Sequence, residues 1–179
     1  MALAAAVCGS PAALAGAGST PRVVVSFPVA PIELGKKTVV VMLDVRAAHS
    51  KLAALSSASH ETLFLHLGRV VAARQPGVLW QVYLGATTQT PRAQSPSFVG
   101  NLALYGAGIR DEADGHAFTP ATFSLPASRA LAAALRRGTT KIRLTFLPTG
   151  PLIAGKRSVP EPKATVTVGA VSITAERNA

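Results

Sequence analysis

The chain has 179 residues, 49% of them hydrophobic and 15% charged, and 18 Lys and Arg against 8 Asp and Glu give a formal net charge of +10. This length suits one folded domain plus a tail, and the composition excludes a disordered chain. The single cysteine, Cys8, excludes an internal disulfide framework and a cysteine-based zinc site.

Residues 1–20 consist of alanine, glycine and small polar residues and are predicted to be a flexible linker or tail. No convincing signal peptide is found, because no Lys or Arg precedes Arg22 and Pro11 interrupts the apolar stretch. No apolar run reaches transmembrane length, so we expect no integral membrane protein. The sequence leaves the compartment open.

From Arg22 onward, strand patterns follow one another to the end of the chain. We predict strands over 22–27, 38–46, 61–71, 78–85, 98–105, 116–124, 141–148 and 163–174. The turn residues at 75–77 predict a hairpin between two of these strands, 61–71 and 78–85. Residues 47–60 carry three serines near their end and are predicted to be a surface excursion.

The stretch Val78–Gly85 is the one around which we expect the rest to pack. Its even positions, Trp80 and Val82 among them, share one face, and Tyr83 lies on the other. A lone tryptophan in a β-branched run is more often a core anchor than a ligand platform, because burying its ring stabilises by about 3 kcal/mol.

Two later strands contain glycines that indicate a local feature of the backbone, a close approach in one and a bulge in the other. In 98–105, the small Gly100 is expected to let another backbone approach. In 163–174 the valines change parity at Gly169 and Ala170, where a bulge would keep all of them inward.

The strand 141–148 alternates cleanly, with Phe146 on the inward face and Thr145 on a face that we expect to be wet. Residues 126–138 predict the one clear helix, ended by Gly138 as a left-handed cap. Seven or eight strands with one short helix predict a mainly β fold, an antiparallel sandwich or flattened barrel. It would span residues 21–175, followed by a disordered tail at 176–179.

Side chains that could carry chemistry are sparse. The four histidines, His49, His60, His66 and His116, show no HExxH or HxH spacing. There is no GxSxG motif and no Gly-rich phosphate loop followed by a helix. We therefore expect no catalytic, cofactor-binding or metal-binding residues in this chain. The basic residues are scattered singly or in pairs, which argues against nucleic acid as the partner.

Several segments resemble, in order, the C-terminal domain of polyphenol oxidases and tyrosinases. Residues 61–85 are similar to the family's paired strands, with Leu79, Trp80, Gln81 and Val82 at the positions of its Lys-Phe-Asp-Val motif and Tyr83 after them. Leu79 and Gln81 replace the Lys and Asp of that motif.

The resemblance extends to four further segments, of which residues 116–135 are similar to the family's strand that leads into a short helix. Phe98 and Gly100 match the family's aromatic-x-Gly strand, residues 141–151 with Phe146 match its strand ending in a Pro turn, and Gly169 matches its closing bulge, where Ala170 replaces a second glycine. The match covers about residues 21–174.

The resemblance implies a hemocyanin-like β-sandwich without copper ligands that packs over the copper entrance of a type-3 copper catalytic domain, in cis or in trans. Such a domain keeps the oxidase latent and assists its folding or copper loading; copper is expected only in that partner. The loops 86–96 and 152–162 are the candidate plugs of the copper site. The alternative is a free-standing basic β-sandwich that binds an acidic macromolecule or protein. An enzyme in its own right is the least supported reading.

Overall fold

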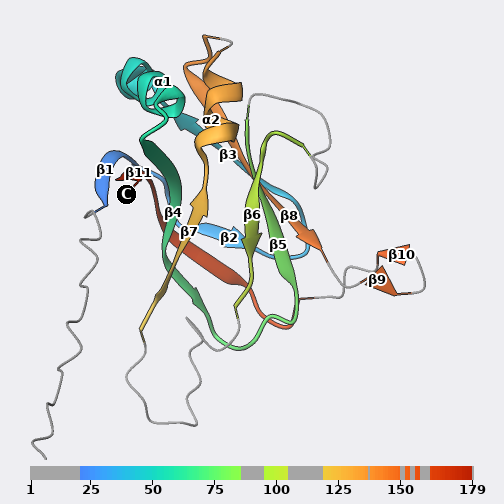
Figure 1. The fold of residues 1–179 in the computed structure, drawn as a ribbon. Coiled ribbons are helices and arrows are strands. Elements are labelled where there is room, and N and C mark those ends of the chain that lie inside the picture. Colours follow the sequence, from blue (N-terminus) through green and yellow to red (C-terminus); the bar gives the residue numbers. More distant parts are fainter. Residues whose placement is uncertain are drawn as a thin grey trace, which may run out of the picture.

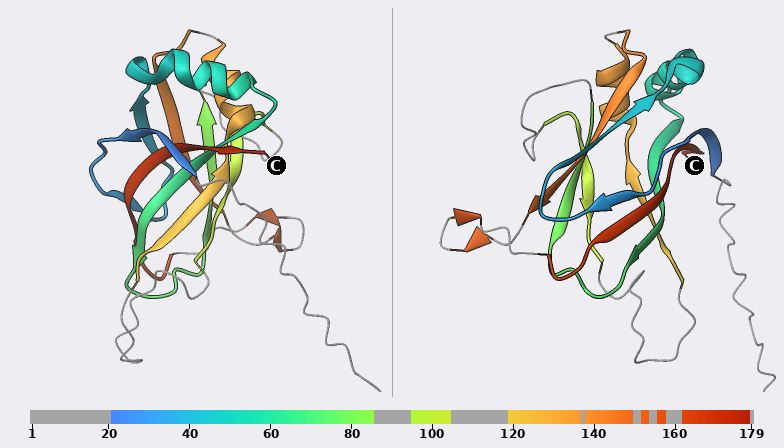
Figure 2. Two further views of the ribbon diagram at one scale, coloured as in Figure 1. Left: turned by 60° about the vertical axis from the view of Figure 1, so that its left-hand side comes forward. Right: turned by 180° about the vertical axis from the view of Figure 1, so that it is seen from behind.

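Two antiparallel sheets face each other in the computed structural model of the chain, with helices at one end (Figures 1 and 2). The structure describes residues 21–85, 95–104, 119–136, 138–149, 152–153, 156–157 and 162–178. The predicted mainly β, antiparallel sandwich is confirmed. The predicted linker 1–20 lies outside the described residues.

The first sheet, called sheet A here, has the order β1 (Arg22–Phe27), β11 (Val166–Arg177), β4 (Glu61–Ala72) and β7 (Ala121–Pro126), with β2 (Ile32–Leu34) also pairing with β11. The second, called sheet B, has the order β3 (Val39–Asp44), β8 (Lys141–Thr149), β5 (Leu79–Gly85) and β6 (Phe98–Leu102). A separate pair consists of β9 (Leu152–Ile153) and β10 (Lys156–Arg157).

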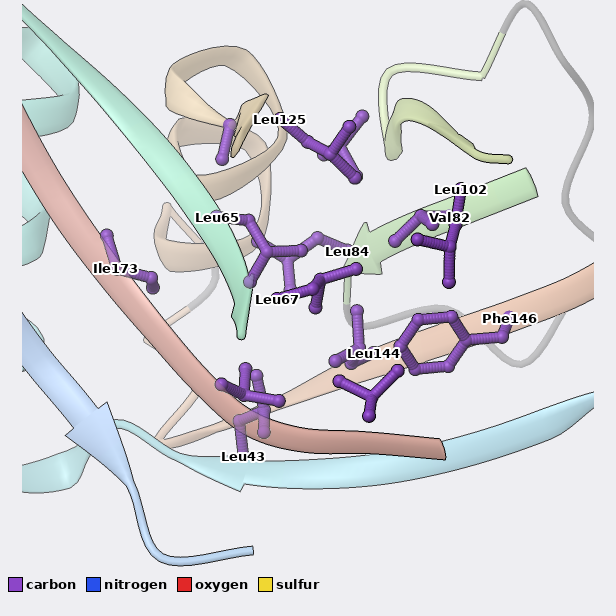
Figure 3. Close-up of a cluster of buried hydrophobic side chains, with 14 of the residues drawn as sticks. Leu43, Leu65, Leu67, Val82, Leu84, Leu102, Leu125, Leu144, Phe146 and Ile173 are labelled. Carbon is purple, nitrogen blue, oxygen red and sulfur yellow. The ribbon is translucent and has the colours of Figure 1, made fainter. Parts of the chain in front are cut away.

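The core lies between the two sheets (Figure 3). Side chains from β4 and β11 meet those from β5, β8 and β3, because each strand turns its alternate apolar positions inward. Burying one such leucine or phenylalanine stabilises by roughly 1.5–3 kcal/mol. The labelled core residues are Leu43, Leu65, Leu67, Val82, Leu84, Leu102, Leu125, Leu144, Phe146 and Ile173.

The predicted helix is present as α2 (Ser128–Leu135). It is fixed to sheet A because Ala127 N–H donates to Leu63 O (2.7 Å) and Leu63 N–H donates to Ser128 Oγ (2.8 Å). The predicted left-handed cap is confirmed, since Gly138 has φ +66° and its N–H donates to Leu135 O.

A second helical segment, η1 (Arg46–Ala48) and α1 (His49–Ser57), corrects the surface excursion predicted for residues 47–60. Leu52 anchors α1, since it is fully buried. The terminal serines do not break the helix, because the Ser56 and Ser57 hydroxyls donate back to Ala53 O at 3.0 and 3.2 Å.

The hairpin predicted between β4 and β5 is wrong, because the two strands belong to different sheets. β4 instead pairs with β11 over almost its whole length, from Glu61 opposite Arg177 to Ala72 opposite Val166. The many hydrogen-bonded residue pairs between β4 and β11 decide the partner of β4, and the turn residues after β4 do not. The chain between β4 and β5 crosses from one sheet to the other.

The parity change predicted near Gly169 is confirmed. Val166 and Val168 before it, and Val171 and Ile173 after it, are all at most 2% exposed. β4 changes parity at the same level, where Arg69 adopts φ +52°, so the two strands stay in register. The spacing of Leu67 and Val70 carries a signal of this second parity change, which was not predicted.

The wet face predicted for β8 is wrong at Thr145, which is 5% exposed. β8 is an inner strand of sheet B, and Thr145 lies between Tyr83 on β5 and Val40 on β3. Lys141, at the start of the strand, is exposed as predicted.

The end of the described chain is tied to the start of β4. Residues 176–178, predicted as part of a disordered tail, continue β11 to Arg177 and then bond through Asn178. Thr62 Oγ1 donates to Asn178 Oδ1 (2.8 Å), Asn178 Nδ2 donates to Ser59 O (3.1 Å), and Asn178 N–H donates to His60 O (2.8 Å).

Candidate functional site

The residues singled out in the sequence fall into three places. Val82, Gly100 and Phe146 form one row across sheet B, since Val82 lies opposite Gly100 on β6 and opposite Phe146 on β8. Val82 and Phe146 are fully buried, so this row belongs to the core. A Cβ on Gly100 would lie 2.8 Å from Leu125 Cδ2, so the close approach at Gly100 is made by a side chain of sheet A and not by the backbone expected there.

Trp80 is fully buried on the same core face. Its indole Nε1–H donates to Gly35 O at 3.1 Å. Gly35 lies in the connection that carries the chain from β2 in sheet A to β3 in sheet B. Trp80 therefore fills the core and fixes a crossover between the sheets, with its one polar atom satisfied.

Tyr83 and Phe98 lie on the outer face of sheet B. Their rings meet edge to face, with centroids 5.4 Å apart and an interplanar angle of 60°. The Tyr83 hydroxyl donates to Gln81 Oε1 at 2.8 Å, and both residues are nearly buried, at 2% and 8% exposure. Gln81 and Tyr83 thus form a shielded polar pair at the position of the family motif.

Gly169 lies in sheet A, apart from the other predicted residues. A Cβ there would lie 3.0 Å from Arg69 Cβ, which explains the small residue. The seven residues therefore do not converge on one pocket, and each has a packing role.

Among the described residues, no three His, Cys, Asp or Glu side chains lie close enough to hold a metal ion. His66 on β4 lies opposite Ser124 on β7, and its Nδ1 is 3.0 Å from Ser124 Oγ, a contact that follows from the strand register. Cys8 and His116 lie outside the described residues.

The two candidate plug loops are only partly described. Of 86–96, residues 86–94 lie outside the described residues. Of 152–162, the structure describes the β9–β10 ribbon, in which Leu152 pairs with Arg157 and Ile153 with Lys156. Figures 1 and 2 show this ribbon standing apart from both sheets, near the end of β8. It is the described element that projects farthest from the sandwich.

Exposed apolar side chains gather on β3. The large hydrophobic residues that are exposed in the described part of the chain are Val23 (58%), Val40 (39%) and Met42 (54%), and two of the three lie on the outer face of this strand. In the sequence, residues 39–43 are apolar on both faces of the strand, but this exposed surface was not predicted from them. No helix among the described residues is long and apolar enough to span a bilayer.

Neither models of known sequence families nor the curated proteins match this chain. Solved structures do. Latent aurone synthase, described as a polyphenol oxidase, matches in its recombinant form with a TM-score of 0.51, 14% identity and 83% of this chain covered. The same enzyme from its natural source matches with a TM-score of 0.50, 15% identity and 90% of this chain covered.

This chain has the fold of part of a latent polyphenol oxidase. It spans only about a quarter of the solved chains that it matches, 26% and 28% of their lengths. At this level of identity the likeness concerns the fold. Most of the latent polyphenol oxidase chain therefore lies outside the shared sandwich.

Proposed function

We propose that this chain is a non-catalytic shielding and regulatory domain of a type-3 copper polyphenol oxidase, of the tyrosinase or catechol oxidase type. It covers the dicopper site of a catalytic domain that is carried on the same polypeptide or on a separate one. The cover excludes phenols and water sterically, which keeps the enzyme latent, and it assists folding or copper loading. Copper belongs to the partner domain.

The observation that carries this proposal is the fold match. The sandwich corresponds to a minor part of an oxidase whose solved form is latent, at 83% coverage of this chain and 26% of that one. The proposal assigns the copper chemistry to the remainder of such an oxidase and the latency to the sandwich.

The β9–β10 ribbon supports a steric mechanism. A cover needs an element that reaches beyond its own sheets, and the ribbon at Leu152–Ile153 and Lys156–Arg157 stands apart from the sandwich (Figure 1). We assign to it the role of the plug, in preference to residues 86–96, on this placement.

The test is co-expression of the full chain with a dicopper oxidase domain encoded beside it or fused to it. We expect diphenol oxidation at least about tenfold below that of the oxidase domain alone, recovered when limited proteolysis removes the sandwich. Equal oxidation with and without the chain, in a preparation where the two co-purify, contradicts the proposal.

A second function is favoured by one observation, the net charge of +10. A free-standing basic sandwich would bind an acidic macromolecule through exposed residues such as Lys36, Lys37 and Lys141. Retention on heparin that is lost steeply with salt, together with no effect on the oxidase, would favour this function instead.

A further inference from the structure

β3 is an edge strand of sheet B whose free side lacks the usual protection. Within the described chain it pairs with β8 alone, in an uninterrupted register from Val39 opposite Phe146 to Asp44 opposite Lys141. Its interior, residues 39–43, contains no charge, no proline and no bulge. Such an edge is a template for pairing with another strand.

The other edge strands of the two sheets all carry a protecting feature. β1 shifts register between Val23 and Val25, and β2 has three residues with a charged one, Glu33, at its centre. The ladder of β6 with β5 shifts register, and β7 ends at Pro126. These are the devices that natural sheets use against edge-to-edge association, so their lack on β3 is specific to that edge.

β3 also exposes apolar area on the outer face, at Val40 (39%) and Met42 (54%). Lys36 and Lys37 precede this apolar run and Asp44 ends it, so the strand has positive charges before its start and a negative charge at its end. An antiparallel copy of the same strand brings the basic start of one beside the acidic end of the other.

We propose that two copies of this chain pair through β3, edge to edge and antiparallel, so that their sheets B join into one continuous sheet. If the two-fold axis is perpendicular to the joined sheet, outer residues of one copy lie opposite outer residues of the other. The two strands can therefore shift past each other only by two residues at a time. With Val40 on the axis, Val39 lies opposite Val41 of the second copy, and the basic segment that precedes β3 lies near Asp44 of the second copy, twice by symmetry.

Charge therefore favours an antiparallel pairing centred near Val40, in which the basic start of each strand lies near the acidic end of the other. Lys36, Lys37 and Asp44 are all exposed, and Asp44 accepts the Arg46 N–H through Oδ1 at 2.9 Å. The interface is one strand wide, and the charge of +10 on each copy opposes association, so the dimer is a weak one. This inference does not depend on the proposed function.

Sedimentation velocity of the full chain over a concentration series, in about 0.15 M salt, tests the pairing. We expect a monomer–dimer equilibrium in which Val40→Lys raises the dissociation constant at least about tenfold, because two lysines then meet at the axis. The matched control is Val23→Lys, which places the same charge at an exposed valine on β1 and should change the constant less than about twofold.

A charge-reversal pair tests the register. Lys36→Asp should weaken the dimer about tenfold, and the double variant Lys36→Asp/Asp44→Lys should bring the dissociation constant back to within about threefold of the parent. Lys36 lies outside β3, so Lys36→Asp still tests the pairing if Val40→Lys does not fold. A parent that stays monomeric up to about 0.5 mM overturns the proposal, as does equal weakening by Val23→Lys or no rescue by the double variant.

Discussion

Trp80→Ala is the substitution whose cost the structure defines best. The indole ring is fully buried on the core face of β5, and its N–H bonds to Gly35 O in the connection between the two sheets. Replacing it with alanine opens a cavity between sheet A and sheet B and leaves the Gly35 carbonyl without this donor. The free energy of unfolding should fall for both reasons.

The magnitude follows from the two losses. Truncating a buried tryptophan to alanine costs roughly 3–5 kcal/mol through lost transfer and cavity formation. The lost hydrogen bond contributes about 1 kcal/mol within that range. Trp80→Phe keeps most of the ring and loses the hydrogen bond, so we expect it to cost about 1–2 kcal/mol.

Urea denaturation followed by far-ultraviolet circular dichroism measures these values, since Trp80 is the one tryptophan of the chain and fluorescence is lost with it. Val23→Ala is the control, because Val23 is 58% exposed and its truncation should change stability by less than about 0.5 kcal/mol. A loss below about 1 kcal/mol for Trp80→Ala would refute the assignment of this ring as the anchor of the core.

Three further substitutions test other parts of the account. Gly100→Ala places a Cβ 2.8 Å from Leu125 Cδ2 on a residue with φ +155° and should cost about 1–3 kcal/mol in thermal unfolding for both reasons, whereas Gly35→Ala, with no atom within 4 Å of its Cβ, should cost under about 1 kcal/mol; equal effects contradict this account of Gly100. Asn178→Ala removes its side-chain hydrogen bonds to the start of β4 and should cost about 1–2 kcal/mol in urea, and an unchanged midpoint would show that the tie is unimportant. Replacing Leu152–Arg157 with Gly and Ser of equal length should leave the melting temperature unchanged and relieve inhibition of the partner oxidase about tenfold; full inhibition without the ribbon would reject it as the plug.

The strands and their inward faces could be predicted from the sequence because they depend on local alternation. Trp80 and Phe146 fall on the core side by parity alone, and the parity change at Gly169 shows in the spacing of valines. The cap at Gly138 was equally accessible, since only glycine takes that conformation without strain.

Strand pairing could not be predicted, because it depends on contacts between residues far apart in the chain. The turn before β5 suggested a hairpin with β4, yet β4 pairs with β11, about a hundred residues later, at Ala72 opposite Val166. Burial of Thr145 follows from the inner place of β8 in its sheet, and α1 depends on Leu52 reaching the core. None of these is a property of a local pattern.

The candidate site was harder to predict than the fold. All seven of the chosen residues, among them Trp80 and Gly169, are explained by packing. The exposure of Val40 and Met42 could not be predicted from the sequence, because a buried strand with two apolar faces gives the same pattern as an exposed edge strand.

The most direct test of the shielding function is a titration of a dicopper polyphenol oxidase domain with this chain, followed by its rate of diphenol oxidation. We predict a saturable loss of turnover that reaches its limit at one chain per oxidase domain, with no loss when the chain is unfolded beforehand. Turnover that stays constant through a molar excess of the folded chain, while the two proteins bind each other, would contradict the account.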